Sequence, residues 1–355
     1  MSEEILRLAG DGIGPEVIDA ASRVITAAAE AEGFTVHFVD GLIGGAAIDA
    51  GEPPLPPSVA ARARDSQAIL LGAVGGPRWE NHRPRPESGL LTLRQELGLF
   101  ANLRPVRVFP GLEAVSPLKA PRVDLVIVRE LTGGLYYGQP RGLNDPDGPD
   151  PEAFETLRYR RSEIVRIVRT AFELARSRGQ ALTSVDKANV LESSRLWRRT
   201  VDEVAAEYPD VVVHHQLVDS AAALLVTDPG RFGVMVTENL FGDILSDLAG
   251  GLAGSLGLCP SASLGSGRQG LYEPVHGSAP DIAGQDVANP LGAILSGAML
   301  LRHSFGRPEA ADRIERAVER ALAEGWRTAD LYTGRPGERR VGCRALADRI
   351  CALVA

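Results

Sequence analysis

The chain has 355 residues, of which 44% are hydrophobic and 24% charged, a composition typical of globular proteins large enough for two domains. The formal net charge of −8 argues against nucleic acid or an anionic membrane as the main partner. Cys259, Cys343 and Cys351 show neither metal-site spacing nor a disulfide framework, which favours a reducing compartment. No stretch is typical of a signal peptide or a membrane span. We therefore expect a soluble, cytoplasmic protein.

Short apolar runs alternate with amphipathic stretches along most of the sequence. This alternation predicts an α/β fold with a largely parallel sheet. The runs that predict strands are residues 5–8, 35–39, 68–72, 125–129, 181–186, 211–216 and 234–237. The stretches that predict helices are residues 16–32, 162–178 and 192–208, together with most of 291–325.

Three alternating glycines, Gly10, Gly12 and Gly14, follow the first predicted strand, and Pro15 comes next. They do not match the G-x-G-x-x-G pattern of a Rossmann dinucleotide site. A tight strand-to-helix turn, in which the proline opens the helix, accounts for them. The sequence therefore does not support an ordinary Rossmann cofactor site, although a nicotinamide cofactor could bind to a different fold.

Two aspartates, Asp243 and Asp247, stand four residues apart in an apolar stretch. On a helix this spacing places both carboxylates on one face, beside an expected apolar stripe of Ile244, Leu248 and Leu252. Two like charges at the edge of a buried face require a compensating positive charge. The pair is equally compatible with a solvated face, and it indicates a divalent cation site only if a third oxygen ligand is supplied elsewhere.

Several basic and acidic residues border other apolar segments. Arg94, Arg104 and Arg129 have the paired N–H groups that suit planar carboxylates, although each alone is compatible with a surface ion pair. Lys187 follows a predicted strand and is either solvated or a base with a lowered pKa. Asp219 begins an apolar helix, where an acid is also favoured by the helix dipole.

Residues 271–290 are rich in Gly, Pro, Ala and Ser, and they predict a structured loop rather than a strand or helix. Its polar positions are His276, Asp281 and Asn289. A loop of this length usually has a function. An acidic residue suits a ribose 2′-hydroxyl and repels a 2′-phosphate.

Taken together, these motifs resemble the isocitrate/isopropylmalate dehydrogenase family of decarboxylating β-hydroxyacid dehydrogenases. The resemblance extends from "GDGIGPEV" to "VGCRALAD", and its most specific motifs are "NLFGDILSD", "GSLGLCPSASLG" and "EPVHGSAPDIAG". It implies the isopropylmalate dehydrogenase-like α/β fold, which is not a Rossmann fold. It also implies a discontinuous first, cofactor-side domain, residues 1–101 plus 254–355, and a second domain, 102–253, with metal ligands and the dimer interface. The active site is expected in the cleft between the domains.

The resemblance also implies roles for individual residues. Mg²⁺ or Mn²⁺ is expected on Asp219, Asp243 and Asp247. The residues expected to bind a small dicarboxylate substrate are Leu90, Arg94, Arg104, Arg129 and Asp219. Tyr136 and Lys187 are the expected acid–base pair, and Lys187 and Asp219 are expected to come from the second subunit of a homodimer. The residues expected to bind NAD are Gly76, Glu87, Glu273, His276, Gly277, Ser278, Ala279, Pro280, Asp281, Ile282 and Asn289.

The implied activity is the NAD-dependent, metal-assisted oxidative decarboxylation of 3-isopropylmalate in leucine biosynthesis. Leu90, with Leu91 and Leu93, resembles the family's contact with an isopropyl group. Glu238 and the glycines of "LAGGLAG" depart from many isopropylmalate enzymes, which leaves a D-malate or tartrate dehydrogenase of the same family open as an alternative. A non-catalytic regulatory paralogue is a further alternative, against which the intact Tyr136, the lysine and the three aspartates argue.

Overall fold

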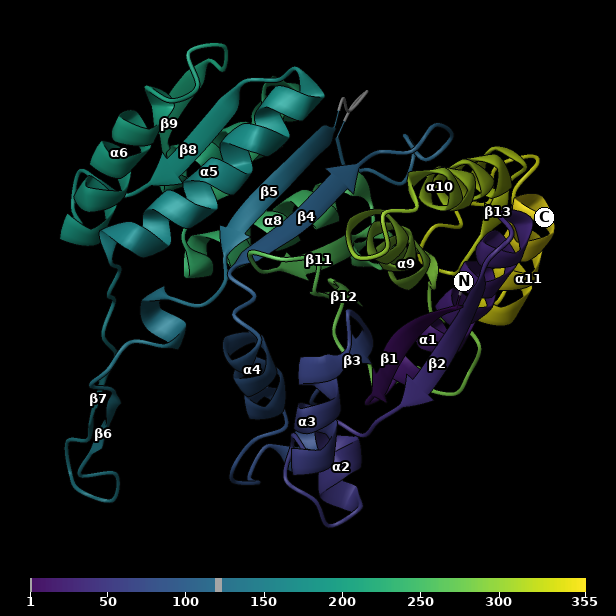
Figure 1. Ribbon diagram of the computed structural model, residues 1–355, viewed down its shortest axis with the longest axis horizontal. Coiled ribbons are helices and arrows are strands. Elements are labelled where there is room, and N and C mark those ends of the chain that lie inside the picture. The colour runs from purple at the N-terminus through teal and green to yellow at the C-terminus, as the bar shows by residue number, and fades with distance from the viewer. Residues whose placement is uncertain (1, 119–122) are drawn as a thin grey trace. The chain divides into compact units, whose positions relative to one another are not determined.

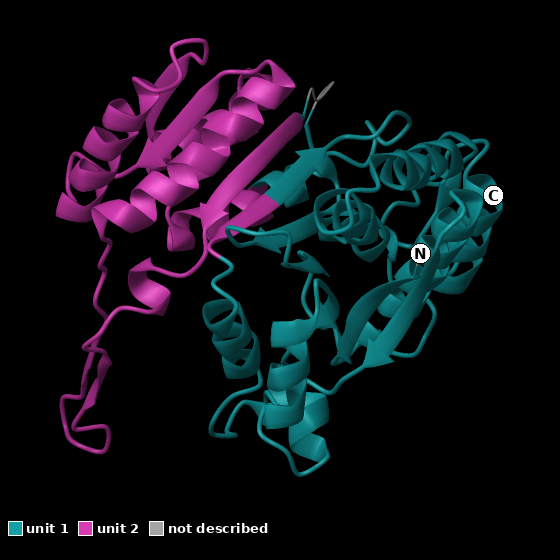
Figure 2. Ribbon diagram, in the orientation of Figure 1, with its two compact units in different colours: residues 1–99, 104–123, 249–355 teal, residues 100–103, 124–248 magenta. Residues whose placement is uncertain are grey.

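The structure is a computed structural model that describes residues 2–118 and 123–355. These residues form two compact units, each discontinuous in sequence (Figures 1 and 2). Unit 1 comprises Met1–Leu99, Arg104–Val123 and Ala249–Ala355, and unit 2 comprises Phe100–Leu103 and Asp124–Leu248. The family-based domain limits at residues 101/102 and 253/254 stay a prediction.

Unit 1 contains a sheet whose strands follow the order β2-β1-β3-β12-β11. Its strands are β1 (Ser2–Gly10), β2 (Thr35–Asp40), β3 (Ala68–Ala73), β11 (Pro260–Leu264) and β12 (Gly270–Pro274). The pairs β1–β2, β1–β3 and β3–β12 are parallel, whereas β11–β12 is antiparallel. Every residue of β3 is buried, as expected for an inner strand of a sheet covered on both faces. Strand β4 (Ala101–Arg107) has residues in both units.

Helices α1 and α10 of unit 1 pack against α9, whose residues 291–301 are all buried. Because α9 is apolar on every side, it occupies the centre of a helical layer. It contacts α1 and α10, and α11 contacts both of these helices. The helices of unit 1 are α1 (Gly14–Ala31), α2 (Gly45–Asp49), α3 (Pro57–Asp65), α4 (Glu87–Glu96), α9 (Leu291–His303), α10 (Pro308–Ala323) and α11 (Cys343–Val354). Short elements add η1 (Pro77–Trp79), η4 (Leu256–Leu258), β13 (Trp326–Arg327) and β14 (Arg339–Arg340).

Unit 2 contains four parallel strands in the order β5-β10-β8-β9. These strands are β5 (Asp124–Glu130), β8 (Leu182–Asp186), β9 (Val213–Leu217) and β10 (Val234–Thr237). The helices are α5 (Arg161–Arg178), α6 (Glu192–Ala205), α7 (Val218–Thr227) and α8 (Asn239–Ala253), the last of which continues into the residues of unit 1. The remaining elements are η2 (Gly134–Tyr136), η3 (Pro229–Arg231) and the hairpin of β6 (Gly142–Asn144) and β7 (Glu152–Phe154).

The register of unit 2 brings the carboxyl ends of its strands to one edge. Thr237 at the end of β10 is paired with Arg129 on β5 and with Val185 on β8. Val185 is paired in turn with Gln216 on β9. The segments that leave these four strands therefore begin side by side, which is where ligands bind in parallel α/β sheets.

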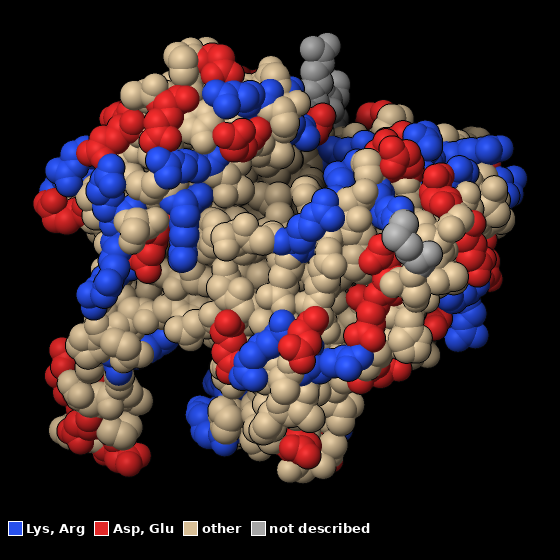
Figure 3. All heavy atoms as spheres, viewed as in Figure 1, with Lys and Arg blue, Asp and Glu red and all other residues tan. Residues whose placement is uncertain are grey.

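Ion pairs connect α5 with α6 and the segment after it. The Arg161–Glu203, Arg169–Glu207 and Arg176–Asp210 pairs have N–O distances of 2.7, 2.8 and 2.6 Å. Figure 3 shows acidic and basic side chains interspersed over this part of unit 2. Solvent and salt screen such exposed pairs, so each contributes little to stability. The stability of α5 therefore depends mainly on its buried apolar face, which comprises Ile164, Ile167, Val168, Ala171, Phe172 and Ala175.

The glycine-rich turn after β1 has the predicted form. Gly10 and Gly12 have φ values of +73° and +58°, and α1 begins at Gly14 with Pro15 in its first turn. A Cβ on Gly12 would lie 1.9 Å from the carbonyl oxygen of Ser278, so the turn needs glycine for close backbone approach as well. Ile13 N donates a hydrogen bond to the same oxygen at 2.8 Å.

The structure has a strand or helix overlapping each predicted one, and two other predictions are wrong. Residues 271–274 are not loop but strand β12, because they pair with β11 on one side and β3 on the other. The stripe of Ile244, Leu248 and Leu252 is buried only at Leu252, since Ile244 is 57% exposed and Leu248 is half-buried, whereas Leu245 and Ala249 are buried. Among the described residues, no helix combines the length and apolarity needed to cross a membrane.

Gly10 and Gly33 provide a matched test of the close approach at the end of β1. Both have φ +73°, but a Cβ on Gly10 would lie 2.0 Å from Ala73 O, whereas a Cβ on Gly33 would meet no described atom within 4 Å. We expect Gly33→Ala to cost about 1–2 kcal/mol through the left-handed backbone alone. Gly10→Ala should cost about 1–3 kcal/mol more, because the β3 backbone must move.

Urea unfolding of both variants beside the unsubstituted protein measures this difference. Equal losses of unfolding free energy for the two variants would show that the contact with Ala73 imposes no constraint on the turn.

Candidate active site

A cluster at the carboxyl edge of the unit 2 sheet contains three of the residues singled out in the sequence. Arg129 is the penultimate residue of β5, Tyr136 closes η2, and Asp243 lies in the second turn of α8. Arg129 donates from Nη1 to Asp243 Oδ1, and the Tyr136 hydroxyl donates to Asp243 Oδ2 at 2.8 Å. The guanidinium of Arg129 also lies 5.6 Å from the centre of the Tyr136 ring. The positive charge needed beside Asp243 is therefore supplied by Arg129.

Burial and the neighbouring charge change the acidity of Tyr136. Partial burial, followed by the hydrogen bond to Asp243, raises the pKa of Tyr136 to about 12. Its hydroxyl is therefore protonated throughout the neutral pH range. A phenol in this state can donate a proton to a reacting group.

A second pair forms where β8 and β9 end. Lys187 Nζ donates to Asp219 Oδ1 at 2.6 Å. The Asp219 side chain is 64% exposed, and the lysine ammonium lowers the pKa of this carboxyl. The parallel pairing of β8 with β9 accounts for the contact, because Lys187 follows β8 directly and Asp219 is the second residue of α7.

The expected metal ligands are only partly gathered within one chain. Asp243 and Asp247 lie one helical turn apart on α8, and Asp247 is exposed. Their carboxylate oxygens are the ligand type that Mg²⁺ and Mn²⁺ take. Within residues 2–118 and 123–355 of this single chain, no group of three or more His, Cys, Asp or Glu side chains is arranged to hold a metal ion. Asp219 is paired with Lys187 instead.

Unit 1 holds the other two arginines. Arg94, on α4, forms an ion pair with Glu273 near the end of β12, and both side chains are only 9% exposed. Arg104, on β4, is 7% exposed. Leu90 lies one helical turn before Arg94 and packs against the apolar core on its partly buried side. Arg94, which is expected to bind substrate, thus directly contacts Glu273, which is expected to bind the cofactor.

The segment after β12 is anchored at both of its ends. Ser278 accepts a hydrogen bond from Ile13 in the glycine turn, and Asn289 donates to Asp330 Oδ2 at 3.0 Å. Burial lowers the pKa of His276, so its ring is neutral at neutral pH. The positions left exposed along the segment include Gly277, Pro280 and Asp281. A long ligand could therefore reach the backbone of this loop.

The remaining expected cofactor residues lie after β3. Gly75 and Gly76 have φ values of +101° and +155°, and a Cβ on Gly75 would lie 2.2 Å from Glu87 Oε1. Glu87, the first residue of α4, is thereby brought against this turn. Asp11 accepts hydrogen bonds from the backbone N–H groups of Gly45, Ala46 and Gly75 at 2.8, 2.7 and 2.7 Å.

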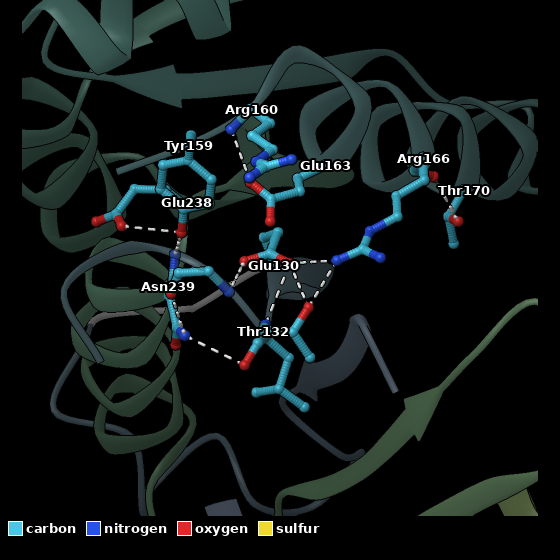
Figure 4. Close-up of polar contacts among 11 residues, drawn as sticks. Glu130, Thr132, Tyr159, Arg160, Glu163, Arg166, Thr170, Glu238 and Asn239 are labelled. Atoms are coloured by element: carbon cyan, nitrogen blue, oxygen red, sulfur yellow. Dashed lines mark hydrogen bonds and ion pairs between the residues drawn. The ribbon is translucent and has the colours of Figure 1, made fainter. Parts of the chain in front are cut away.

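Several residues around the Arg129 cluster were not predicted from the sequence. Polar residues at the end of β5, before α5 and at the start of α8 form a connected network, drawn in Figure 4: Glu130, Thr132, Tyr159, Glu238 and Asn239. All of them except Thr132 are buried. Only Glu238 had been noted, as an unusual residue beside the metal-ligand helix. Asp11 was also missed, although it lies within the quoted glycine motif. In the sequence, Glu130 directly follows one predicted strand and Asn239 closely follows another. This position could have indicated that both residues lie near the site.

Comparison with known proteins finds similarity over almost the entire chain. The family model described as isocitrate/isopropylmalate dehydrogenase matches residues 4–350. A relative from Synechococcus sp. (strain JA-3-3Ab), named 3-isopropylmalate dehydrogenase, is 54% identical over 356 residues, which cover 99% of this chain and 93% of the relative. A relative of the same name from Bacillus licheniformis is 56% identical over 339 residues, covering 94% of this chain and 92% of its own.

Solved structures agree with the fold as well. The crystal structure of isocitrate dehydrogenase from Methylococcus capsulatus superposes with a TM-score of 0.89 at 38% identity, covering 99% of each chain. Sequence and backbone are therefore similar over the same nearly full length. The chain belongs to the isocitrate/isopropylmalate dehydrogenase family.

Proposed function

We propose that this protein catalyses the NAD-dependent oxidative decarboxylation of (2R,3S)-3-isopropylmalate to 4-methyl-2-oxopentanoate, a step of leucine biosynthesis. The observation that carries this proposal is the 51–56% identity, over nearly the full chain, to relatives named 3-isopropylmalate dehydrogenase. The Arg129–Asp243–Tyr136 cluster supports it, since it combines a carboxylate binder, a carboxylate and a protonated phenol.

The substrate is a dicarboxylate with an apolar branch, and the proposed binding residues match both features. Arg94, Arg104 and Arg129 bind its carboxylates through paired N–H groups. All three guanidinium groups belong to buried residues, so each gains more from a bound anion than an exposed arginine would. Leu90 binds the isopropyl group, and its partly exposed side chain leaves apolar surface available for that contact.

Two residues move protons. Lys187, in its neutral form, takes the C2 hydroxyl proton directly or through water as hydride leaves the same carbon. The resulting β-keto acid loses CO₂ and forms an enolate. Tyr136 then protonates the enolate carbon, consistent with a pKa of about 12 that keeps its hydroxyl protonated.

The proposed holders of the cofactors follow the donor chemistry described above. Asp219, Asp243 and Asp247 would hold Mg²⁺ or Mn²⁺ through oxygen atoms. The segments around Gly76, Glu87 and Glu273, together with residues 276–282 and Asn289, would hold NAD. When bound, NAD⁺ accepts the hydride and the divalent cation stabilises negative charge on the C2 oxygen.

The preference for NAD over NADP rests on Asp281. This residue is exposed in the loop after β12, where an acidic side chain can bind a ribose 2′-hydroxyl. A 2′-phosphate at the same place would meet like charge. Ile282, next in sequence, offers no compensating cation.

The functional unit is proposed to be a homodimer in which Lys187 and Asp219 act on the site of the partner subunit. Ile244 and Val226, on α8 and α7, are 57% and 44% exposed, and such apolar surface favours burial against another subunit. The β6–β7 hairpin also carries Leu143, which is 57% exposed. A two-stranded hairpin is only marginally stable by itself, so a partner would stabilise it. The three free cysteines are consistent with a proposed cytoplasmic location.

A steady-state assay tests the proposed reaction and its cofactor together. We expect 3-isopropylmalate to give a higher kcat/KM than D-malate, tartrate or isocitrate, and NAD⁺ to exceed NADP⁺ by at least about a hundredfold because of like-charge repulsion at Asp281. A higher kcat/KM for D-malate or tartrate would show that this compound, and not 3-isopropylmalate, is the substrate of this family member. No turnover with any of the four would favour a regulatory paralogue.

Removal of one carboxylate tests the metal assignment. Asp247→Asn should lower activity at limiting Mg²⁺ or Mn²⁺ by at least about tenfold, because it replaces a negatively charged carboxylate ligand with a neutral amide oxygen. The melting temperature without metal should be unchanged or slightly higher, since like charges four residues apart on a helix repel. Asp65→Asn, at the exposed end of α3, is the matched control. An Asp247→Asn enzyme with unchanged metal dependence would contradict the assignment.

Subunit exchange tests the shared site. Lys187→Ala and Tyr136→Phe proteins are each expected to be inactive. In a mixed dimer one site receives both substitutions and the other receives neither, so equal mixing should restore about a quarter of the wild-type activity. Mass spectrometry verifies the exchange. If mixed dimers form and remain inactive, Lys187 and Tyr136 act within the same chain.

A further inference from the structure

Asn239, the first residue of α8, is fully buried and uses its entire side-chain amide in hydrogen bonds. Its Oδ1 accepts from Arg129 Nε at 3.0 Å and from Arg129 Nη2 at 2.7 Å. Its Nδ2 donates to Leu131 O at 3.2 Å and to Gly133 O at 3.0 Å. A carboxamide offers two acceptor sites and two N–H groups, so all four are engaged.

The two sides of this amide serve different parts of the candidate active site. The oxygen side fixes the edge of the Arg129 guanidinium that carries Nε and Nη2, and Nη1 is then directed at Asp243. The nitrogen side holds the segment that leads directly into η2, where Tyr136 lies. One side chain therefore connects the proposed carboxylate binder with the proposed proton donor.

Neighbouring residues hold Asn239 and the same segment from behind (Figure 4). The Tyr159 hydroxyl accepts from Asn239 N at 3.0 Å and donates to Glu238 Oε2 at 3.3 Å. Glu130, whose side chain is completely buried, accepts from Thr132 N at 3.1 Å and from Gly133 N at 2.8 Å. The backbone around the amide is therefore fixed on both sides, and the amide cannot turn without breaking several bonds.

The glycines of this segment show how closely it is packed. A Cβ on Gly133 would lie 2.6 Å from Tyr159 Cε1, and a Cβ on Gly134 would lie 2.6 Å from the Tyr159 hydroxyl oxygen. The Tyr159 ring in turn packs edge-on against Trp197, with 5.8 Å between ring centres. The segment between β5 and Tyr136 thus lies on a rigid surface, and Asn239 determines its position relative to Arg129.

We propose that Asn239 is a positioning residue of the reaction, whose amide holds the Arg129 guanidinium and the Tyr136 segment in fixed relation to each other. It acts through these two residues and does not itself touch the substrate. The inference rests on the proposed function, because it assigns carboxylate binding to Arg129 and proton donation to Tyr136. A purely structural role for the same bonds is the alternative, and the kinetic constants of folded enzyme distinguish the two.

Two substitutions of Asn239 change the hydrogen bonds of its amide in different ways. Asn239→Asp keeps an oxygen toward Arg129 but places a second carboxylate oxygen against the carbonyls of Leu131 and Gly133. Asn239→Ala removes all four bonds. Thr200→Val is the matched control, since Thr200 is fully buried in unit 2 and its hydroxyl donates within α6, to Leu196 O at 2.8 Å.

The measurement is kcat and KM per folded enzyme, with the folded fraction taken from near-ultraviolet circular dichroism at the assay temperature. For both Asn239 variants we expect KM for 3-isopropylmalate to rise about tenfold and kcat to fall about tenfold to a hundredfold, because small misplacements of binding and catalytic groups are costly. KM for NAD⁺ should stay within about twofold, as should all constants of Thr200→Val. These outcomes together support the positioning role.

Three results would overturn the proposal. The first is unchanged kcat and KM per folded enzyme in both Asn239 variants. The second is failure of both variants to fold while Thr200→Val folds, which would make the amide structural. The third is an equal change in the Thr200→Val control. If the unsubstituted enzyme turns over D-malate or tartrate instead, the substrate proposal fails separately, and the same comparison is made with that substrate.

Discussion

The guanidinium of Arg129 is almost completely removed from water at the carboxyl end of β5, and the surrounding site is arranged to compensate for this. An isolated buried cation is strongly unfavourable, so its N–H groups need partners that are themselves fixed. Asn239 provides an uncharged acceptor on one edge, and Asp243 provides a negative charge. Because both partners come from α8, the first two turns of this helix are tied to the end of β5.

The same arrangement gives two carboxylates of α8 different environments. Asp243 is engaged by Arg129 and Tyr136, whereas Asp247, one turn later, is exposed. The positively charged guanidinium of Arg129 contacts both the Asp243 carboxylate and the Tyr136 ring. The residues proposed for substrate binding, proton donation and metal binding thus contact one another in a single cluster of charged and polar groups.

The parallel strands and main helices were predictable because their apolar periodicities are local. Strand β3 reads as an uninterrupted apolar run and is buried at every residue, and the turn at Gly10 follows from alternating glycines with a proline. Strand β12 was not predictable, since its pairing with β3 joins positions far apart in sequence. The prediction that the Ile244 stripe borders a buried face failed for a related reason. Helical spacing identifies residues on one face of a helix, but it does not identify what that face packs against. The roles of Asn239 and Glu130 were not predictable either, because their bonds connect residues from separate strands and helices.

The order of residues in unit 1 has a consequence for the synthesis of the chain. Strand β3 is complete at Ala73, but its neighbour β12 begins only at Gly270, and the helices that pack on α1 come later still. At a translation rate of about 5–20 residues per second, roughly 10–40 s separate the emergence of these two strands from the ribosome. All of unit 2 is synthesised within that interval. One edge of β3 must therefore remain without β12 until this later segment is made, although β1 is already available on the other side. An unpaired strand edge in an incompletely folded unit is a site where aggregation can begin.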